Sequence, residues 1–513
     1  MESSQQLPGR RAYALSAVLC SALFALPFLL VTYPPITDLP QQMGQIRLLL
    51  DAWGGDEELR VHGFHHPNKL SFALLLVCWW LVGPPAAGRL AVYLIGLLWV
   101  AATHALAYEL RRPPWLAALA ALCFFNHITY WGFLNFLLGL PVFAFWFLLL
   151  RRLDARAPEA SANPLRLGLA GPALLLGAAL LYSAHVLWLG AGLGWLGLTT
   201  LARWSWREIV ARSAWVAPVA IGAVGWWYAF YAHQTAFTGS TWGALPWQRL
   251  NPGWLLSQIF GGLRGPLELV ILAALIGLAV LGLWQQRHHL RRLAGDSLRH
   301  PARSAWLAGL CFLGGVLVLP EYHHTTAFAG RWLPVAVVFL VLSIPPLRLK
   351  PIYPATLAAL LVVALISSTS LAWLTFDRQE LAGVDECLEA LPEGQRLLGL
   401  AFIAQSSRLA GHPFHHIYAW GQVLRDAELN RSFAAIEPAG LVVYHDVPRK
   451  YPWTEGLDFF PHKFRAEDRD HFQYLMIYAM PGVHASFLAD PNLEPVTPDL
   501  PWRLYRVLSF RGG

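Results

Sequence analysis

Ionisable side chains gather at a few places in an otherwise apolar chain, and Asp38 marks the first of them. It lies in the segment TYPPITDLPQQMGQIRLL, which directly follows a long apolar run. A carboxylate in this position can act as a general base that takes the proton from a hydroxyl nucleophile. Asp is also a favoured N-cap, so the same residue could simply begin the amphipathic helix that follows. The sequence makes Asp38 a candidate catalytic residue and leaves the capping role open.

A second group lies in the segment LPEYHHTTAFAGRWLP. Glu321, His323 and His324 have side chains that could ligate a divalent metal such as Mg or Mn, or could form a network within the loop. Arg331 follows at the mouth of an apolar run. Its planar fork of donors suits a phosphate, whereas an isolated arginine in such a place often reaches to lipid headgroups.

Two further segments carry candidate substrate-binding residues. His65 and His66 end a polar stretch, and imidazole can bind phosphate, shuttle a proton or ligate a metal. Solvent-facing loop histidines are an equal alternative. In CFFNHITYWGFLNFLLG, the side chains of Asn126, His127 and Asn135 predict the polar wall of a cavity. The aromatic residues of that segment alone would indicate an interfacial belt.

The composition decides what kind of scaffold positions these residues. The 513 residues are 56% hydrophobic and only 13% charged, against roughly 25% charged residues in soluble domains. Apolar runs recur at the length that a helix needs to cross about 30 Å of hydrocarbon. The five cysteines show neither a disulfide framework nor a zinc spacing. A soluble protein, a secreted disulfide scaffold and a disordered chain are excluded, and we predict a polytopic α-helical membrane protein.

About eleven transmembrane helices are expected. We predict them at residues 12–33, 86–108, 115–129, 133–150, 167–183, 186–202, 213–231, 265–284, 304–320, 332–346 and 352–375. Lys and Arg concentrate in the connections that lie inside when the N-terminus is cytoplasmic, as the positive-inside rule requires. The N-terminus is therefore predicted to be cytoplasmic.

The long first outer loop, residues 34–85, holds two further helical patterns. Residues 68–82 are apolar but too short to span comfortably, so they predict a re-entrant or interfacial helix. Leu39, Met43 and Ile46 recur at helical spacing with glutamines between them. This pattern predicts an amphipathic helix lying in the headgroup region.

The composition changes after residue 375, where a small α/β domain, 376–513, is expected to follow the transmembrane domain, 1–375. Strand-like runs at 396–404, 441–445, 474–480 and 502–508 alternate with helical or loop segments. Eleven spans from a cytoplasmic N-terminus place this domain on the outer side. The candidate polar residues also lie at the outer ends of spans, and ionisable groups at membrane depth are usually functional. Any chemistry is therefore expected at the outer face.

These features resemble the GT-C superfamily of membrane glycosyltransferases, above all the protein O-mannosyltransferases and the aminoarabinose transferase of lipid A. The resemblance covers most of the chain: a first span, a long outer loop that opens with an acidic residue, many further spans and an outer C-terminal domain. Motifs add to the resemblance. A His/Pro-led apolar helix, an Ala-Gly-Arg-Leu start of a span and a basic inner turn follow one another in HHPNKLSFALLLVCWWLVGPPAAGRLAVYLIGLLWVAATHALAYELRRPPWLAALAAL. A further motif is WGFLNFLLG at 131–139.

The resemblance implies a donor made of a sugar on a polyprenyl phosphate, used at the outer face of a bacterial inner membrane. Asp38 matches by position the acidic residue that acts as catalytic base in that superfamily. The acceptor would be a hydroxyl of a glycan, lipid or protein, and no nucleic acid is expected as a partner. Glu321 is similar to an acidic residue near the metal of oligosaccharyltransferases, but NHITYWGFLN lacks their acidic pair. The mannosyl- and aminoarabinosyl-type branch therefore fits better.

Other functions remain open at this stage. A transporter or flippase for lipid-linked envelope precursors would be favoured by polar groups near the midplane and by repeated halves. A non-catalytic assembly protein would use the C-terminal region to bind a partner. A metal-dependent hydrolase or transferase would use the outer histidines.

Overall fold

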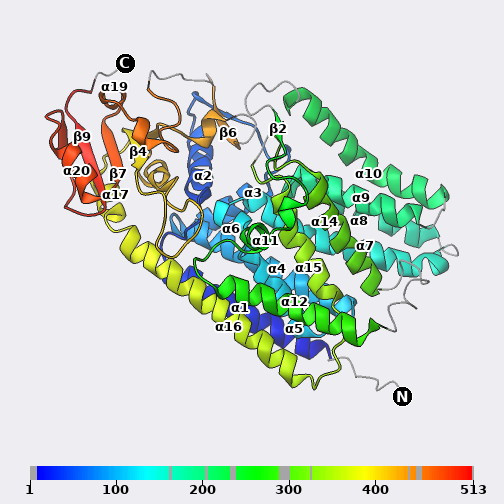
Figure 1. Ribbon diagram of the computed structural model, residues 1–513. Helices are drawn as coiled ribbons and strands as arrows, with labels where there is room; N and C mark the ends of the chain where they lie inside the picture. Colours follow the sequence, from blue (N-terminus) through cyan, green and yellow to red (C-terminus); the bar gives the residue numbers. More distant parts are fainter. Residues whose placement is uncertain are drawn as a thin grey trace.

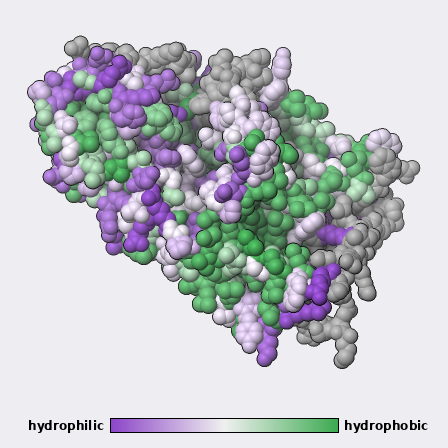
Figure 2. All heavy atoms as spheres, in the orientation of Figure 1, coloured by the Kyte–Doolittle hydropathy of each residue, from purple (hydrophilic) through white to green (hydrophobic). Residues whose placement is uncertain are grey.

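Long helices make up most of the molecule, and the last part of the chain forms a five-stranded sheet (Figure 1). The computed structural model describes residues 9–160, 164–202, 206–231, 239–287, 301–323, 326–436, 440–445 and 453–510. Hydrophobic residues dominate the helical part on the face seen in Figure 2, whereas hydrophilic residues gather over the sheet. This division is expected when the helices meet lipid and the sheet meets water.

Six helices are long and apolar enough to cross a membrane, at Arg10–Leu30, Ala86–Glu109, Leu134–Asp154, Glu208–Ala229, Leu267–Gln285 and Ile352–Glu380. Shorter apolar helices occur at Leu70–Val82, Gly171–Ala184, Val186–Leu201, Arg303–Val318 and Gly330–Ser343. The chain is therefore a multi-pass membrane protein. The count of eleven spans stays a prediction.

Ten of the predicted spans coincide with helices. They are α1 (Arg10–Leu30), α4 (Ala86–Glu109), α7 (Leu134–Ala160), α8 (Pro164–Ala184), α9 (Val186–Leu201), α10 (Trp206–Trp226), α12 (Leu267–Gln285), α14 (Pro301–Val318), α15 (Leu333–Ser343) and α16 (Ile352–Thr375). Helices α8, α9 and α10 lie side by side at the edge of the molecule away from the sheet (Figure 1).

The predicted span 115–129 differs, because it is not one helix. It consists of α5 (Pro114–Ala121), a 3-10 turn (Leu122–Phe124) and α6 (His127–Trp131). The break occurs where the Asn126 side chain accepts hydrogen bonds from the backbone N–H groups of Ile128 and Thr129 and so starts a new helix.

The centre of the helical part is an aromatic core. Helix α1 packs on α4 and α16, and α5 packs on α4, α15 and α16. The rings of Phe24, Phe28, Trp99, Phe124 and Trp373 meet there at tilted or edge-to-face angles, which is the favoured geometry for aromatic pairs.

Within the first outer loop, α2 (Leu39–Trp53) is a helix as predicted, but its polar side is covered by protein. Gln41 donates to the carbonyl of Arg431 and accepts from the N–H of Phe433, and Gln45 accepts from the N–H of Val442. Gln41 and Gln45 thus face the C-terminal part of the chain, and a position of α2 in the headgroup region stays a prediction. They satisfy backbone groups of the C-terminal part of the chain, which the spacing of α2 alone could not reveal.

The same loop also joins the C-terminal part through a small sheet. Strand β1 (Leu59–Val61) pairs antiparallel with β6 (Val442–Tyr444), so that Leu59 lies opposite Tyr444 and Val61 opposite Val442. The following helix α3 (Leu70–Val82) packs on α2, α4 and α7. The loop 34–85 thus lies between the long helices and the C-terminal part of the chain.

The five-stranded sheet has the order β5-β4-β7-β9-β8, from strands β4 (Arg396–Ala401), β5 (Glu428–Leu429), β7 (Tyr474–Tyr478), β8 (Leu493–Pro495) and β9 (Trp502–Val507). Strands β4, β5 and β7 are parallel, and β9 is antiparallel to β7 and β8. Strand side chains alternate between the two faces of the sheet. Leu397 therefore packs in the main hydrophobic core that the helices share, whereas Leu398 packs in a second, smaller core within the C-terminal part of the chain. Short helices α17 (Val384–Ala390), α18 (Trp420–Arg425), α19 (Ala466–Arg469) and α20 (Pro481–Leu488) complete this part.

Candidate active site

Asp38 is held at the start of α2 with its carboxylate directed away from the helix. Its backbone N–H donates to the carbonyl of Trp131 (3.0 Å), and the N–H of Thr37 donates to Tyr130 (2.9 Å). The side chain makes no capping hydrogen bond to α2. Its Oδ1 instead lies 3.2 Å from Nδ1 of His416. The side chain of Asp38 therefore does not cap α2, and its buried carboxylate faces His416.

The segment 131–139, WGFLNFLLG, connects most of the site. Gly132 adopts φ +87°, and a Cβ there would lie 3.2 Å from the Cβ of Asp38, so only glycine allows this approach. Asn135 accepts from the N–H of Ser71 and so fixes the start of α3 against α7. The rings of Phe133 and Phe136 lie on the other side of the segment, beneath Arg331.

A cluster from the C-terminal part of the chain completes the surroundings of Asp38. His415 and His416 have adjacent rings, with centroids 4.3 Å apart. Nε2 of His415 lies 3.6 Å from Oδ2 of Asp458, and Nη1 of Arg431 lies 3.3 Å from the same oxygen. Burial, together with the neighbouring His416 and Arg431, lowers the pKa of His415 to about 2, so its ring is neutral at physiological pH.

Sequence reasoning missed this cluster, because its residues lie in the segment predicted to be a separate domain. One signal was available. The pattern His-x-Phe-His-His occurs twice, as HGFHH at 62–66 and as HPFHH at 412–416. Only the first copy was singled out, and it is the second that lies beside Asp38.

The first copy forms a separate group. The rings of His65 and His66 are 4.5 Å apart, and the ring of His62 lies 5.2 Å from that of His66. The indole N–H of Trp226 donates to Nδ1 of His66 (3.0 Å). Burial, then the nearby His65, His62 and Lys69, lower the pKa of His66 to about 4. These contacts place His65 and His66 next to the end of α10, and a role in substrate binding stays a prediction.

Arg331 is buried just before α15, in the short turn Gly330–Trp332. Its Nη2 donates to the carbonyl of Thr326 (2.6 Å) and its Nε to that of Ala327 (3.2 Å). The guanidinium lies 5.0 and 5.2 Å from the ring centroids of Phe133 and Phe136, which is cation–π geometry. Arg331 is thus fixed by protein and does not reach to headgroups.

Two histidines share the surroundings of Arg331. His127 donates from Nδ1 to the carbonyl of Gln258 (2.6 Å), and its buried Nε2 has no hydrogen-bond partner among the described residues. In that tautomer Nε2 is an acceptor, which suits a hydroxyl. Desolvation, followed by the charge of Arg331, lowers the pKa of His185 to about 3. The neutral ring accepts from the N–H of Leu187 at the start of α9.

The remaining predicted residues have local structural contacts. The Asn126 amide caps α6 and donates to the carbonyl of Cys123. Glu321 accepts from the N–H of Ala244, and His323 lies 2.6 Å from the hydroxyl of Ser240 across the pair β2 (Ser240–Thr241) and β3 (Tyr322–His323). His324 lies outside the described residues. Metal binding by Glu321, His323 and His324 stays a prediction.

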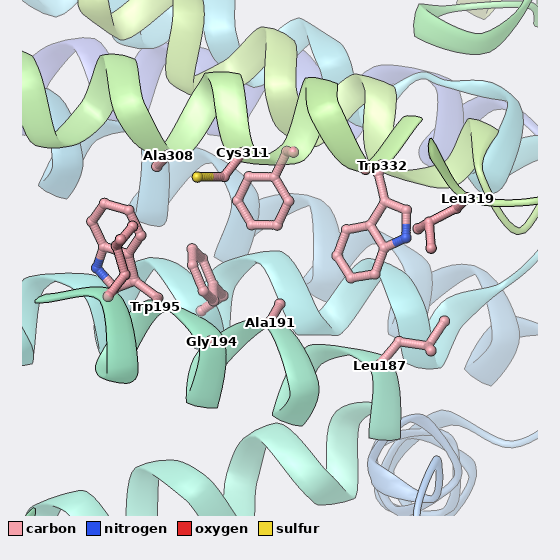
Figure 3. A pocket seen from close by; sticks show the side chains of 12 residues that line it. Leu187, Ala191, Gly194, Trp195, Ala308, Cys311, Leu319 and Trp332 are labelled. Atoms are coloured by element: carbon pink, nitrogen blue, oxygen red, sulfur yellow. The ribbon is translucent and has the colours of Figure 1, made fainter. Parts of the chain in front are cut away.

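An apolar cleft opens beside Arg331, between α9 and α14 (Figure 3). It has a volume of about 440 Å³ and is lined by Phe143, Leu187, Ala191, Gly194, Trp195, Leu198, Ala308, Cys311, Phe312, Gly315, Leu319 and Trp332. Trp195 and Trp332 lie at its two ends (Figure 3). The indole N–H of Trp332 has no partner in the part of the chain that the structure describes. The lining of the cleft is apolar apart from the indole N–H groups, and Trp332 is the lining residue that follows Arg331 in the chain.

Comparison with known proteins gives the fold. No family model and no curated protein matches the sequence. The structure is similar to that of ArnT from Cupriavidus metallidurans in the apo state (TM-score 0.54, 13% identity, 98% of both chains) and bound to undecaprenyl phosphate (TM-score 0.54, 13% identity, 98% of this chain and 99% of that one). The arabinofuranosyltransferase AftD from Mycobacteria matches with a TM-score of 0.49 and 16% identity, over 99% of this chain and 40% of AftD. ArnT and AftD are GT-C superfamily glycosyltransferases. The helical membrane fold expected from the sequence is confirmed: the chain has the fold of ArnT.

Proposed function

We propose that the chain is a membrane glycosyltransferase that moves a sugar from a polyprenyl-phosphate donor to an acceptor hydroxyl at the outer face of the membrane. The observation that carries this proposal is the pair of groups on either side of segment 131–133. The backbone N and the Cβ of Asp38 lie against Gly132, and the guanidinium of Arg331 lies on the ring of Phe133. A proton acceptor and a cation that would bind phosphate thus both contact the same short segment.

The donor would bind along the cleft between α9 and α14. A polyprenyl chain is apolar and flexible, and the lining residues offer apolar contacts throughout. At the Trp332 end the phosphate would meet Arg331. Hydrogen bonds from a guanidinium to phosphate are charge-assisted, and its planar fork can present two N–H donors to one phosphate. ArnT binds undecaprenyl phosphate on the same fold, which supports this class of donor.

In the proposed reaction, Asp38 accepts the proton of the acceptor hydroxyl while that oxygen attacks the anomeric carbon. The bond between the anomeric carbon and the phosphate oxygen breaks, and the phosphate leaves with the electron pair. Because this leaving group is already a stable anion, stabilising its charge matters more than a general acid. Attack opposite the leaving phosphate inverts the anomeric configuration. Nε2 of His127, an acceptor near Arg331, would hold a sugar hydroxyl.

The same proposal sets the topology. Residues 1–375 form the transmembrane domain with about eleven spans and a cytoplasmic N-terminus, and residues 376–513 form the outer α/β domain, in a bacterial inner membrane. The lysine and arginine bias of the predicted inner loops supports this orientation. The contacts of α2 with Arg431, Phe433 and Val442 support a site that both domains build together.

The test is transfer of a radiolabelled sugar from polyprenyl phosphate in membranes that contain the full chain. Asp38→Asn should lower the rate about 10²- to 10⁴-fold, the usual contribution of a general base. The matched control is Asp51→Asn at the far end of α2, where the carboxylate pairs with Arg47. Undiminished transfer by the Asp38→Asn variant would remove Asp38 from the mechanism. A flippase would move the lipid across the bilayer without releasing polyprenyl phosphate, which the same assay detects.

A further inference from the structure

The cluster beside Asp38 contains buried polar atoms that the protein leaves without hydrogen bonds. His415, His416 and Asp458 are 7%, 4% and 4% exposed. Nε2 of His415, both ring nitrogens of His416 and Oδ2 of Asp458 have no hydrogen-bond partner among the described residues. Buried polar atoms nearly always have a partner, so several orphans in one place need an explanation.

The chemistry of these atoms is that of a metal site. One ligand atom from each of the three residues lies within 4.8 Å of the other two. Nε2 of His415 and Oδ2 of Asp458 are 3.6 Å apart, close to the roughly 3.4 Å between two ligands of a tetrahedral ion with bonds of about 2.0–2.1 Å. We propose that His415, His416 and Asp458 bind one divalent ion of the zinc class, with Asp38 orienting His416.

The contact between Asp38 and His416 is an independent argument for this site. A metal-bound histidine usually donates its other ring N–H to a carboxylate, which fixes the tautomer and the ring orientation. With Nε2 of His416 on the ion, Nδ1 would face Oδ1 of Asp38, and these two atoms are 3.2 Å apart. Asp38 thus occupies the place of the orienting carboxylate.

The donor set favours zinc over magnesium. Magnesium prefers oxygen ligands and retains several waters, whereas two imidazoles and one carboxylate are a typical donor set for Zn²⁺ with a fourth position for water. Arg431 lies 3.3 Å from Oδ2 of Asp458 and partly over the ring of Phe459. Its positive charge opposes the ion, so removing it should strengthen metal binding.

The experiment measures metal content and does not depend on sugar transfer. Its result therefore tests the metal site independently of the proposed glycosyltransferase function. The full chain is purified in detergent, stripped with EDTA, equilibrated with Zn²⁺ and analysed for zinc per chain. Co²⁺ in place of Zn²⁺ reports tetrahedral coordination by its visible absorption. We expect one equivalent of zinc in the unaltered protein and almost none in His415→Ala, His416→Ala and Asp458→Asn.

Two matched controls locate the ion. His412→Ala lies in the same segment, with its ring against Trp131, and should keep the full equivalent. Glu321→Gln removes a carboxylate of the alternative metal site and should also keep it. Size-exclusion profiles and melting temperatures of the variants show whether a variant has lost a ligand or has misfolded. Asp458→Glu keeps a carboxylate and should restore zinc binding.

Two further variants sharpen the assignment. Asp38→Asn should weaken zinc affinity about 10-fold or more, the usual effect of losing the carboxylate behind a metal-bound histidine. Arg431→Gln should tighten it. The proposal is overturned if the unaltered protein holds no zinc after equilibration, if zinc disappears with Glu321→Gln, or if His415→Ala, His416→Ala and Asp458→Asn all retain it.

Discussion

The two sides of segment 131–133 differ in how the protein treats polar groups. The guanidinium of Arg331 is held by protein, since it donates to the carbonyls of Thr326 and Ala327 and lies on two aromatic rings. Two neutral groups near it, Nε2 of His127 and the indole N–H of Trp332, have no partner among the described residues. Around Asp38, Nε2 of His415, both ring nitrogens of His416 and Oδ2 of Asp458 lack hydrogen bonds among the described residues, and Oδ2 of Asp458 has the ion-pair contact with Arg431. The first arrangement suits holding a charged ligand in a fixed place, and the second suits an added ion or a reacting hydroxyl.

Replacing the arginine tests the first side of this comparison. Arg331→Gln should raise the KM for the polyprenyl-phosphate donor roughly 10- to 100-fold, since hydrogen bonds to charged groups contribute about 1.5–3 kcal/mol. The KM for the acceptor should change little. The control is Arg264→Gln, which removes bonds to Gln405 and to the carbonyl of Leu409. Equal changes in both KM values would show that Arg331 does not bind the donor phosphate.

Filling the cleft tests where the lipid lies. Ala191→Trp places a large side chain in the cleft between α9 and α14 and should slow transfer from long-chain donors by roughly 10-fold. Donors with a short prenyl chain should be affected less. Gly190→Trp is the matched control, because the neighbouring position faces open space. A loss that is independent of chain length would place the lipid elsewhere.

The glutamine contacts of α2 test how firmly the Asp38 side is assembled. Gln41→Ala removes the bonds to the carbonyl of Arg431 and the N–H of Phe433, which lie at a partly buried contact. It should lower the free energy of unfolding by about 1–3 kcal/mol, measured as a lower melting temperature in detergent. Gln395→Ala, which loses one bond at the surface, should have little effect.

The smallest effect concerns pH. Lys69 is buried and donates to the carbonyl of Gly440, and burial lowers its pKa to about 7. Above pH 7 the folded chain has released this proton while the unfolded chain keeps it to about pH 10, so stability should rise with pH in this window. The melting temperature of the unaltered protein should rise between pH 7 and 9.5 relative to Lys69→Met. A parallel pH profile in both proteins would contradict the assignment.

The long helices could be predicted from the sequence because an apolar run and its length are local properties. The predicted span 86–108 and the observed α4 (Ala86–Glu109) nearly coincide. The break at Asn126 was missed because a cap inside an apolar run leaves no change in composition. The two predicted strands 474–480 and 502–508 are neighbours in the sheet, but their pairing could not be read from alternation alone.

The candidate site was predicted in part, for a physical reason. Asp38 and Arg331 stand out because charges are rare near membrane depth. The partners of Asp38 lie in a polar region where histidines and acids are common, so His416 and Asp458 gave no comparable signal. What distinguishes His416 and Asp458 is their burial, which the sequence does not show. This burial depends on contacts between α2 and residues about 400 positions later in the chain. One such contact is the hydrogen bond from the N–H of Val442 to Gln45, which are 397 residues apart.

That separation has a consequence for how the protein is made. Strand β1 is synthesised early, whereas its pairing with β6 requires Val442–Tyr444 near the end of the chain. At about 5–20 residues per second, β1 therefore waits some 20–80 s for its partner strand. A nascent chain that already spans the bilayer still lacks the strand that closes the junction. Ribosomal stalling or proteolysis ahead of residue 442 would therefore leave an inserted chain without the β1–β6 pair, and this junction could close only when translation is nearly complete.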